Sequence, residues 1–123
     1  MTLALLLAGC NTPGPAFRGI DPVRITVRGD MFDVRVDHLR AQAIRLNTRW
    51  TPNINAVPPQ GVAAIERVSG CRVRKLDGDA AVMTARLDCG QRLAPLPRGQ
   101  EYDCDVYEIV DGLAELSCEA VRY

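Results

Sequence analysis

The sequence predicts an α+β fold that is mainly antiparallel β-sheet, with about six or seven strands, one short helix near residues 60–69 and two disulfide bonds. Three observations lead to this fold class: repeated segments that alternate apolar and polar residues, one segment with helical spacing, and an even set of cysteines in the C-terminal half. A length of 123 residues, 47% of them hydrophobic, fits one domain with one core. Since one short helix cannot cover so many strands, we expect the sheet to curl or to split in two.

A β-hairpin is expected at the start of the domain. Residues 23–29 and 31–37 alternate apolar and polar residues with a period of two, and Gly29-Asp30 between them has the composition of a turn. The segment 40–50 fits a helix or a strand, and a strand is preferred because it continues the hairpin.

The single helix is expected after a loop rich in proline and asparagine at 51–61. Apolar residues in the segment 60–69 have helical spacing, and Gly70 provides a stop signal. A further loop is expected between Cys89 and Tyr102. Four more strands are expected, at 71–76, 79–89, 101–110 and 113–121.

The first ten residues carry a motif with a defined chemistry. An apolar run from Leu3 to Ala8 suits entry into a membrane, the small Gly9 suits a peptidase, and the thiol of Cys10 can take a diacylglycerol group. Leu7-Ala8-Gly9-Cys10 resembles the lipobox of bacterial lipoproteins. The resemblance covers only these residues. It implies cleavage before Cys10, lipidation of its thiol and acylation of its new amino group, for example with palmitate.

The segment 1–9 is short for a lipoprotein signal peptide. It has no Lys or Arg and only six apolar residues before Gly9, whereas signal peptides have a basic region and a longer apolar core. We therefore expect it to be truncated, with the true start upstream. The alternative is that Leu3–Leu7 is a buried element and Cys10 a core thiol. A transmembrane span is not expected, because no stretch approaches the required ~20 apolar residues.

Three parts of the chain follow from this motif: a signal peptide at 1–9, a lipidated cysteine with a Pro/Gly-rich tether at 10–22, and a single domain at 23–123. The tether has a reach of roughly 35 Å if extended. By the same resemblance, Asn11 favours sorting to the outer rather than the inner membrane. The expected location is therefore the periplasmic side of the bacterial envelope, anchored by lipid.

The cysteines other than Cys10 form an even set, which in an exported chain predicts two disulfide bonds. Their spacing lacks the paired C-x-x-C pattern of structural zinc sites, so zinc is disfavoured. Local pairing is preferred because each bond would join the ends of one hairpin. The set comprises Cys71, Cys89, Cys104 and Cys118, paired in that order.

Strand parity tests this pairing. A three-residue turn Asp111-Gly112-Leu113 would place Cys104 diagonally from Cys118, within reach after a bulge or strong twist. A tight Asp77-Gly78 turn would place Cys71 opposite Thr84 instead of Cys89. Either that turn is wider, or the pairing is instead Cys89 with Cys104 and Cys71 with Cys118.

The formal net charge of zero conceals a segregation of charge. Residues 1–49 hold seven Arg and four Asp, and residues 50–100 hold seven basic and four acidic residues, so each part carries +3. Residues 101–123 hold seven acids and one Arg, which is −6. A zero total argues against a nucleic-acid partner. The acidic hairpin fits three interpretations: a solvated face or partner of the Arg-rich strands, a docking surface for a basic protein, or a calcium site at Asp103, Asp105 and Glu108.

No catalytic residue is identified. His38 beside Asp37 has the character of a surface residue, and neither Ser69 nor Ser117 lies in a G-x-S-x-G motif. Phosphate-binding loops, metal-ligand clusters and dinucleotide fingerprints are absent from the sequence, so we expect no enzyme activity, no metal and no small-molecule cofactor.

The loop after Trp50 is the second candidate contact surface. Trp is favoured at interface hot spots, and Trp50 opens a loop that carries Asn53 and Asn55. The alternative is that Trp50 anchors the core. The hypothesis is a non-enzymatic binding or assembly module of the cell envelope with an envelope protein as partner. The alternative is a small envelope inhibitor or enzyme that acts on a cationic protein or cell-wall component.

Overall fold

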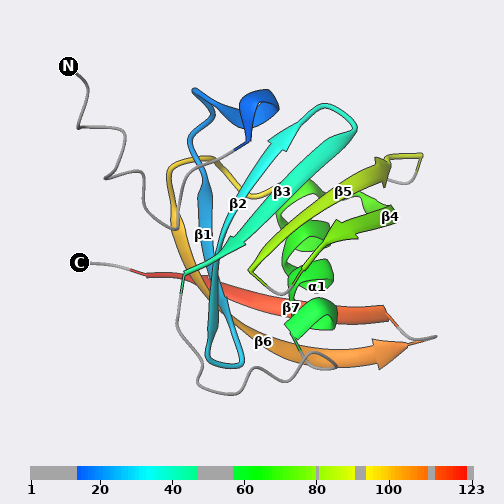
Figure 1. The fold of residues 1–123 in the computed structure, drawn as a ribbon. Coiled ribbons are helices and arrows are strands. Elements are labelled where there is room, and N and C mark those ends of the chain that lie inside the picture. Colours follow the sequence, from blue (N-terminus) through cyan, green and yellow to red (C-terminus); the bar gives the residue numbers. More distant parts are fainter. Residues whose placement is uncertain (1–13, 47–56, 80, 91–93, 111–112, 122–123) are drawn as a thin grey trace.

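The computed structural model describes residues 14–46, 57–79, 81–90, 94–110 and 113–121, which form one curled β-sheet around one helix (Figure 1). None of the helices in these ranges is long and apolar enough to cross a membrane. The elements in chain order are the 3-10 helix η2 (Pro15–Phe17), strands β1 (Val23–Val27), β2 (Asp30–Asp37) and β3 (Arg40–Arg45), helix α1 (Val57–Ser69), and strands β4 (Arg72–Gly78), β5 (Val82–Asp88), β6 (Glu101–Val110) and β7 (Leu113–Ala120).

The seven strands form a single sheet in the order β4-β5-β3-β2-β1-β6-β7. All neighbouring strands are antiparallel except β1 and β6, which run parallel. The α+β class and the mainly antiparallel sheet are therefore confirmed. The parallel β1–β6 pair was not expected. Its two strands are separated in the chain by the helix and two hairpins, so no local turn signal in the sequence indicates that they pair.

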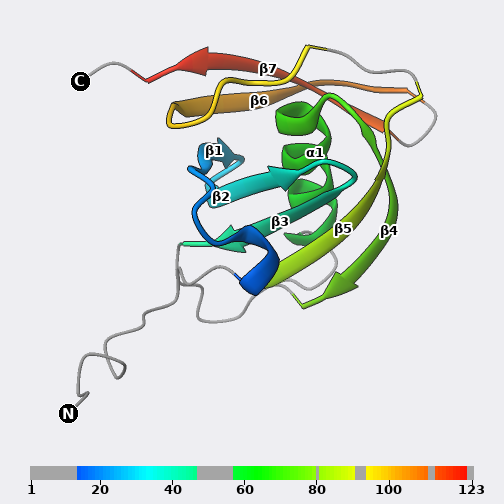
Figure 2. The same ribbon diagram turned by 90° about the horizontal axis from the view of Figure 1, so that it is seen from above.

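The sheet curls, which allows one 13-residue helix to cover the inner face of a seven-stranded sheet. Figure 2 shows the strands bending around α1, with β6 and β7 on one side of the helix and β3 and β5 on the other. The core lies between the helix and the concave face of the sheet. It is built from the inward residues of alternating strands and one stripe of α1, among them Val23, Ile25, Val27, Phe32, Val34, Ala43, Ala64, Ile65, Met83 and Leu87.

Two boundaries differ from the sequence prediction. The first turn is Arg28-Gly29, with φ of 49° and 85°, and Asp30 is already a buried residue of β2. Two positive φ angles suit a two-residue hairpin because their twist matches that of the strands. Helix α1 begins at Val57, so that Pro58 and Pro59 occupy its first turn, where a missing N–H costs little.

Both predicted disulfide bonds are present, with the local pairing. Cys71 is bonded to Cys89 and Cys104 to Cys118. The β4–β5 turn is wider than Asp77-Gly78, since Gly78 pairs with Met83. A one-residue register shift between Val73 and Lys75 then aligns the cysteines at the ends of the strands.

The β6–β7 hairpin also contains a one-residue register shift. β6 ends at Val110 and β7 begins at Leu113, so the expected three-residue turn is wrong: Leu113 already belongs to the strand. A register shift between Val106 and Glu108 places Cys104 directly opposite Cys118, with a Cα–Cα distance of 4.1 Å, rather than diagonal to it.

The part of the expected tether that the structure describes is packed against the sheet. From Gly14 the chain crosses the outer, convex face of β3 and β2. The Gly14 N–H donates to Oε1 of Gln42 (3.2 Å), the Ile20 carbonyl accepts from Nε of Arg35 (3.1 Å), and Phe17 is 3% exposed. The folded unit therefore begins by Gly14, and residues 14–22 are not a free tether.

Candidate functional site

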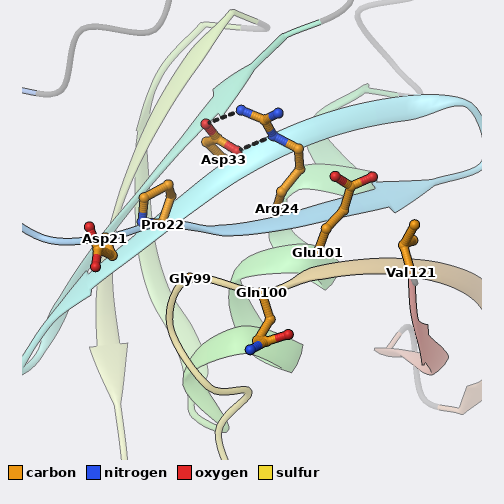
Figure 3. A pocket seen from close by; sticks show the side chains of 8 residues that line it. All are labelled: Asp21, Pro22, Arg24, Asp33, Gly99, Gln100, Glu101 and Val121. Atoms are coloured by element: carbon orange, nitrogen blue, oxygen red, sulfur yellow. Dashed lines mark hydrogen bonds and ion pairs between the residues drawn. The ribbon is translucent and has the colours of Figure 1, made fainter. Parts of the chain in front are cut away.

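A hollow of about 400 Å³ opens on the outer face where β1 and β6 begin side by side (Figure 3). Their parallel pairing builds it. The Arg24 N–H donates to the Gln100 carbonyl and the Gly99 N–H to the Pro22 carbonyl, both at 2.9 Å, which joins the two strand entries. The lining residues are Asp21, Pro22, Arg24, Asp33, Gly99, Gln100, Glu101 and Val121.

One wall of the hollow is a two-point ion pair. Arg24 of β1 lies opposite Asp33 of β2, and its Nε and Nη2 donate to the two carboxylate oxygens at 2.8 and 3.0 Å. The side chain of Asp33 is fully buried, whereas that of Arg24 is 40% exposed. Bidentate pairs of this kind fix both partners, so this wall is rigid.

The hollow carries a surplus of negative charge. Arg24 is the only cation among its lining residues, which include three acids, so the formal charge is −2. Glu101 is the register partner of Arg24 on β6 and lines the hollow beside it (Figure 3). A cationic or hydrogen-bond-donating group suits such a site.

Acidic side chains continue from the hollow along β6 and β7. Cys104 is buried toward the core, so Asp103 and Asp105 on either side of it face outward, and both are exposed. Glu119 of β7 is exposed directly opposite Asp103. We call Glu101, Asp103, Asp105 and Glu119 the acidic surface.

The fold does not neutralise the outer part of this surface. In the described part of the chain, no ion pair joins Asp103, Asp105 or Glu119 to a basic residue. Like charges that face each other across antiparallel strands destabilise a sheet. The acidic hairpin does pair with the Arg-rich strands, through β6 and β1, where Glu101 is the register partner of Arg24. That pairing and the stability of the sheet do not account for the Asp103–Glu119 pair, which a use of the negative charge explains better.

Only part of the predicted contact set can be placed. Asp103 and Asp105 lie together on the acidic surface, and Glu108 follows in β6, where its side chain lies outside the described residues. Trp50, Asn53 and Asn55 of the predicted loop, and Cys10 of the lipidation motif, also lie outside them.

Sequence reasoning missed the hollow itself. Its residues come from segments 21–33 and 99–101, which meet only through the parallel β1–β6 pair, and from Val121, which is hydrogen-bonded to Glu101. The one available signal was the alternation of Arg24 and Asp33 on the polar sides of two predicted hairpin strands, which places them on one face.

The three residues considered for catalysis lie apart in the fold. His38, with φ of 54°, is in the β2–β3 turn, where its side chain is 85% exposed and its Nδ1 lies 3.9 Å from a carboxylate oxygen of Asp37. Ser69 is buried, and its Oγ accepts from the Cys71 N–H at 3.1 Å. Ser117 is exposed opposite Asp105. Over the ranges that the structure describes, no three His, Cys, Asp or Glu side chains gather to hold a metal ion.

Neither the sequence nor the fold links the chain to a known family. A comparison with protein-family models, curated proteins and solved structures finds no match.

Proposed function

We propose that the chain is a lipid-anchored, periplasm-facing lipoprotein of the bacterial envelope that acts as a non-enzymatic binding or assembly module. In this proposal the acidic surface and the adjoining hollow receive a cationic patch of an envelope protein. The observation that carries it is the group of outward acids Asp103, Asp105 and Glu119, which form no ion pair with a basic residue in the described part of the chain, next to a hollow of formal charge −2.

The arrangement suits recognition of Lys and Arg side chains. Arg24 and Asp33 form a fixed wall, so a partner side chain entering the hollow meets a preorganised site. The exposed acids around it raise the rate of encounter with a basic surface and set the orientation of docking. Binding of this kind weakens with added salt, because exposed charges are screened within about 10 Å at 0.1 M ionic strength.

The anchor rests on the N-terminal motif. Leu7-Ala8-Gly9-Cys10 supports cleavage and lipidation at Cys10, and Asn11 supports sorting to the outer membrane. More than one acyl chain gives stable attachment, where one chain gives marginal attachment. The two disulfide bonds agree with an oxidising compartment such as the periplasm.

The second candidate is a small envelope inhibitor or enzyme that acts on a cationic protein or cell-wall component. The size of the hollow supports this candidate, since about 400 Å³ is within the range of small-ligand pockets and suits one cationic group of a protein or of a cell-wall component. Both candidates use the same acids and differ in the nature of the partner.

The experiment is affinity capture of the tagged full chain from detergent-solubilised membranes, with chemical crosslinking before solubilisation. The test variant is Asp103→Asn/Asp105→Asn. The matched control is Asp77→Asn/Asp88→Asn, which removes two exposed acids from β4 and β5 at the other end of the sheet.

We expect a stoichiometric, salt-sensitive envelope partner with the wild type and the control, and its loss with the test variant. A captured soluble hydrolase would favour the inhibitor. Equal capture by both variants would refute the role of the acidic surface. Mass spectrometry of the membrane fraction tests the anchor separately, because an unmodified Cys10 in the mature protein contradicts it.

A further inference from the structure

Three cations face one another across the outer face of the sheet, far from the acidic surface. Arg40 of β3 is the register partner of Arg86 of β5, which is the partner of Lys75 of β4. All three are exposed. We call them the basic row. Asp37 of β2 pairs with Arg40 (3.5 Å) at one end of the row, which leaves it with a formal charge of +2. Neighbouring like charges destabilise a sheet, so fold stability does not account for the row.

An exposed aliphatic side chain lies beside these cations. Leu39, in the turn between β2 and β3, is 58% exposed, and its carbonyl accepts from the Leu87 N–H at 2.8 Å, which ties the turn to β5 next to Arg86. Arg74, at the bulge of β4, adds a further exposed cation. Basic side chains around an exposed apolar residue are typical of surfaces that bind the interface of an anionic membrane.

The lipid anchor would approach the same face. Gly14 is hydrogen-bonded to Gln42, which lies on the outer face of β3 two residues from Arg40, about 7 Å along the strand. Three residues lie between Cys10 and Gly14, and the four Cα–Cα steps that join them span at most about 14 Å even when fully extended. A bilayer that holds an acylated Cys10 would therefore lie close to the basic row.

We propose that the basic row and Leu39 dock the domain onto an anionic phospholipid bilayer, with the phosphates of acidic headgroups as the groups bound. This inference rests on the proposed lipid anchor, which supplies the approach. The domain then lies against the membrane instead of standing roughly 35 Å clear of it. Since β3–β5 and β6–β7 lie on opposite sides of α1 (Figure 2), the acidic surface points away from the lipid toward a partner.

The test measures binding of the full chain to vesicles without its acyl groups, in a Cys10→Ser background. Vesicles of phosphatidylcholine alone are compared with vesicles that contain phosphatidylglycerol. The test variants are Arg86→Gln/Lys75→Gln and Leu39→Ser. The matched control is Arg28→Glu, which changes the net charge by the same −2 at the exposed β1–β2 turn, at the opposite end of β2 from the basic row.

We expect binding to phosphatidylglycerol vesicles that weakens about fivefold for each cation removed from the row, and less than twofold for Arg28→Glu. Leu39→Ser should weaken binding to the anionic vesicles without changing the salt dependence. Equal losses in Arg86→Gln/Lys75→Gln and Arg28→Glu, or equal binding to both kinds of vesicle, would overturn the docking. Because the assay contains no acyl chain, its failure is separate from a failure to find lipid on Cys10.

Discussion

Arg24 holds the only fully buried carboxylate that lines the hollow. The side chain of Asp33 is fully buried, and its two carboxylate oxygens accept hydrogen bonds from Nε and Nη2 of Arg24. Removing one partner of such a pair leaves an uncompensated charge, which costs far more than the pair itself contributes. The residue thus links the stability of the sheet to the shape of the proposed binding site.

Arg24→Gln is expected to lower the free energy of unfolding by about 2 kcal/mol, less than the cost in a fully buried pair because Arg24 is 40% exposed. Urea denaturation followed by circular dichroism measures it. Arg18→Gln, at an exposed arginine near η2, serves as the control and should change stability by less than about 0.5 kcal/mol. Equal effects of the two substitutions would show that Asp33 does not depend on Arg24.

Asp79 shows how a single exposed carboxylate organises a turn. Its Oδ1 accepts the N–H groups of Val82 (3.0 Å) and Ala81 (2.8 Å), and these two hydrogen bonds hold the pKa of Asp79 below its ordinary value, with a smaller contribution from the positive charge of Arg45. The ionised form is therefore favoured in the folded state. Its contribution to stability is present above the unfolded pKa, near 4, and is lost as the pH falls through the lower folded pKa.

Asp79→Ala should therefore destabilise the protein by about 0.5 kcal/mol at pH 7, a small value because the site is exposed. The difference from wild type should shrink as the pH is lowered from about 4 toward 2, since the wild-type carboxylate is then protonated. Urea midpoints measured across this range check the prediction, with Asp77→Ala on β4 as the control. A difference that stays constant down to pH 2 would contradict it.

Among the elements, the two disulfide-bonded hairpins show where sequence reasoning succeeds and where it stops. Alternating apolar residues and terminal cysteines predict both hairpins and both bonds. The register does not follow from that pattern, because each hairpin contains a one-residue shift, between Val73 and Lys75 and between Val106 and Glu108. A bulge reverses which residues face each other beyond it, and no residue type in either strand demands one.

The β4–β5 turn depends on Gly78. Its φ is +107°, and a Cβ at this position would collide with the backbone carbonyl of Val82, an atom that cannot move aside. Gly29 also has a positive φ, 85°, but a Cβ there would meet no atom within 4 Å. Both positions therefore require a positive φ, which favours glycine, but only at Gly78 would an added Cβ also collide with the backbone.

Gly78→Ala should cost at least about 1 kcal/mol more in unfolding free energy than Gly29→Ala, which should itself cost about 1 kcal/mol. Thermal and urea denaturation of the oxidised proteins measure both. Non-reducing peptide mapping verifies that the Cys71–Cys89 bond has formed in each variant. Equal costs would mean that the turn widens to admit the methyl group.

Across the whole molecule, the curl of the sheet gives the charge pattern its direction. The sequence shows a basic body and an acidic C-terminal hairpin, but only the strand order separates them in space. The parallel β1–β6 pair places the acidic hairpin at the β1 side of the sheet, at the far end from β4. Since such long-range pairing leaves no local signal, neither the hollow nor the opposition of the two charged surfaces could be predicted from the sequence.

If the acidic surface binds a protein and the basic row binds lipid, substitutions in one surface should leave the binding of the other partner unchanged. Asp103→Asn/Asp105→Asn should abolish capture of the envelope partner and leave vesicle binding at the wild-type level or slightly above it, because removing acids weakens repulsion from anionic lipid. Arg86→Gln/Lys75→Gln should lower vesicle binding about 25-fold, the product of two fivefold losses, and leave capture of the partner intact in detergent, where no bilayer is present.

Crosslinking in intact cells provides the measurement that joins the two surfaces. The basic-row variant should there give less partner crosslink than it gives in detergent, because an anchored domain that is not held against the bilayer no longer directs its acidic surface outward. If each pair of substitutions instead lowered both partner capture and vesicle binding to the same extent, the acidic and basic residues would belong to one continuous interface. The separation of the two surfaces by the curl of the sheet would then have no functional meaning.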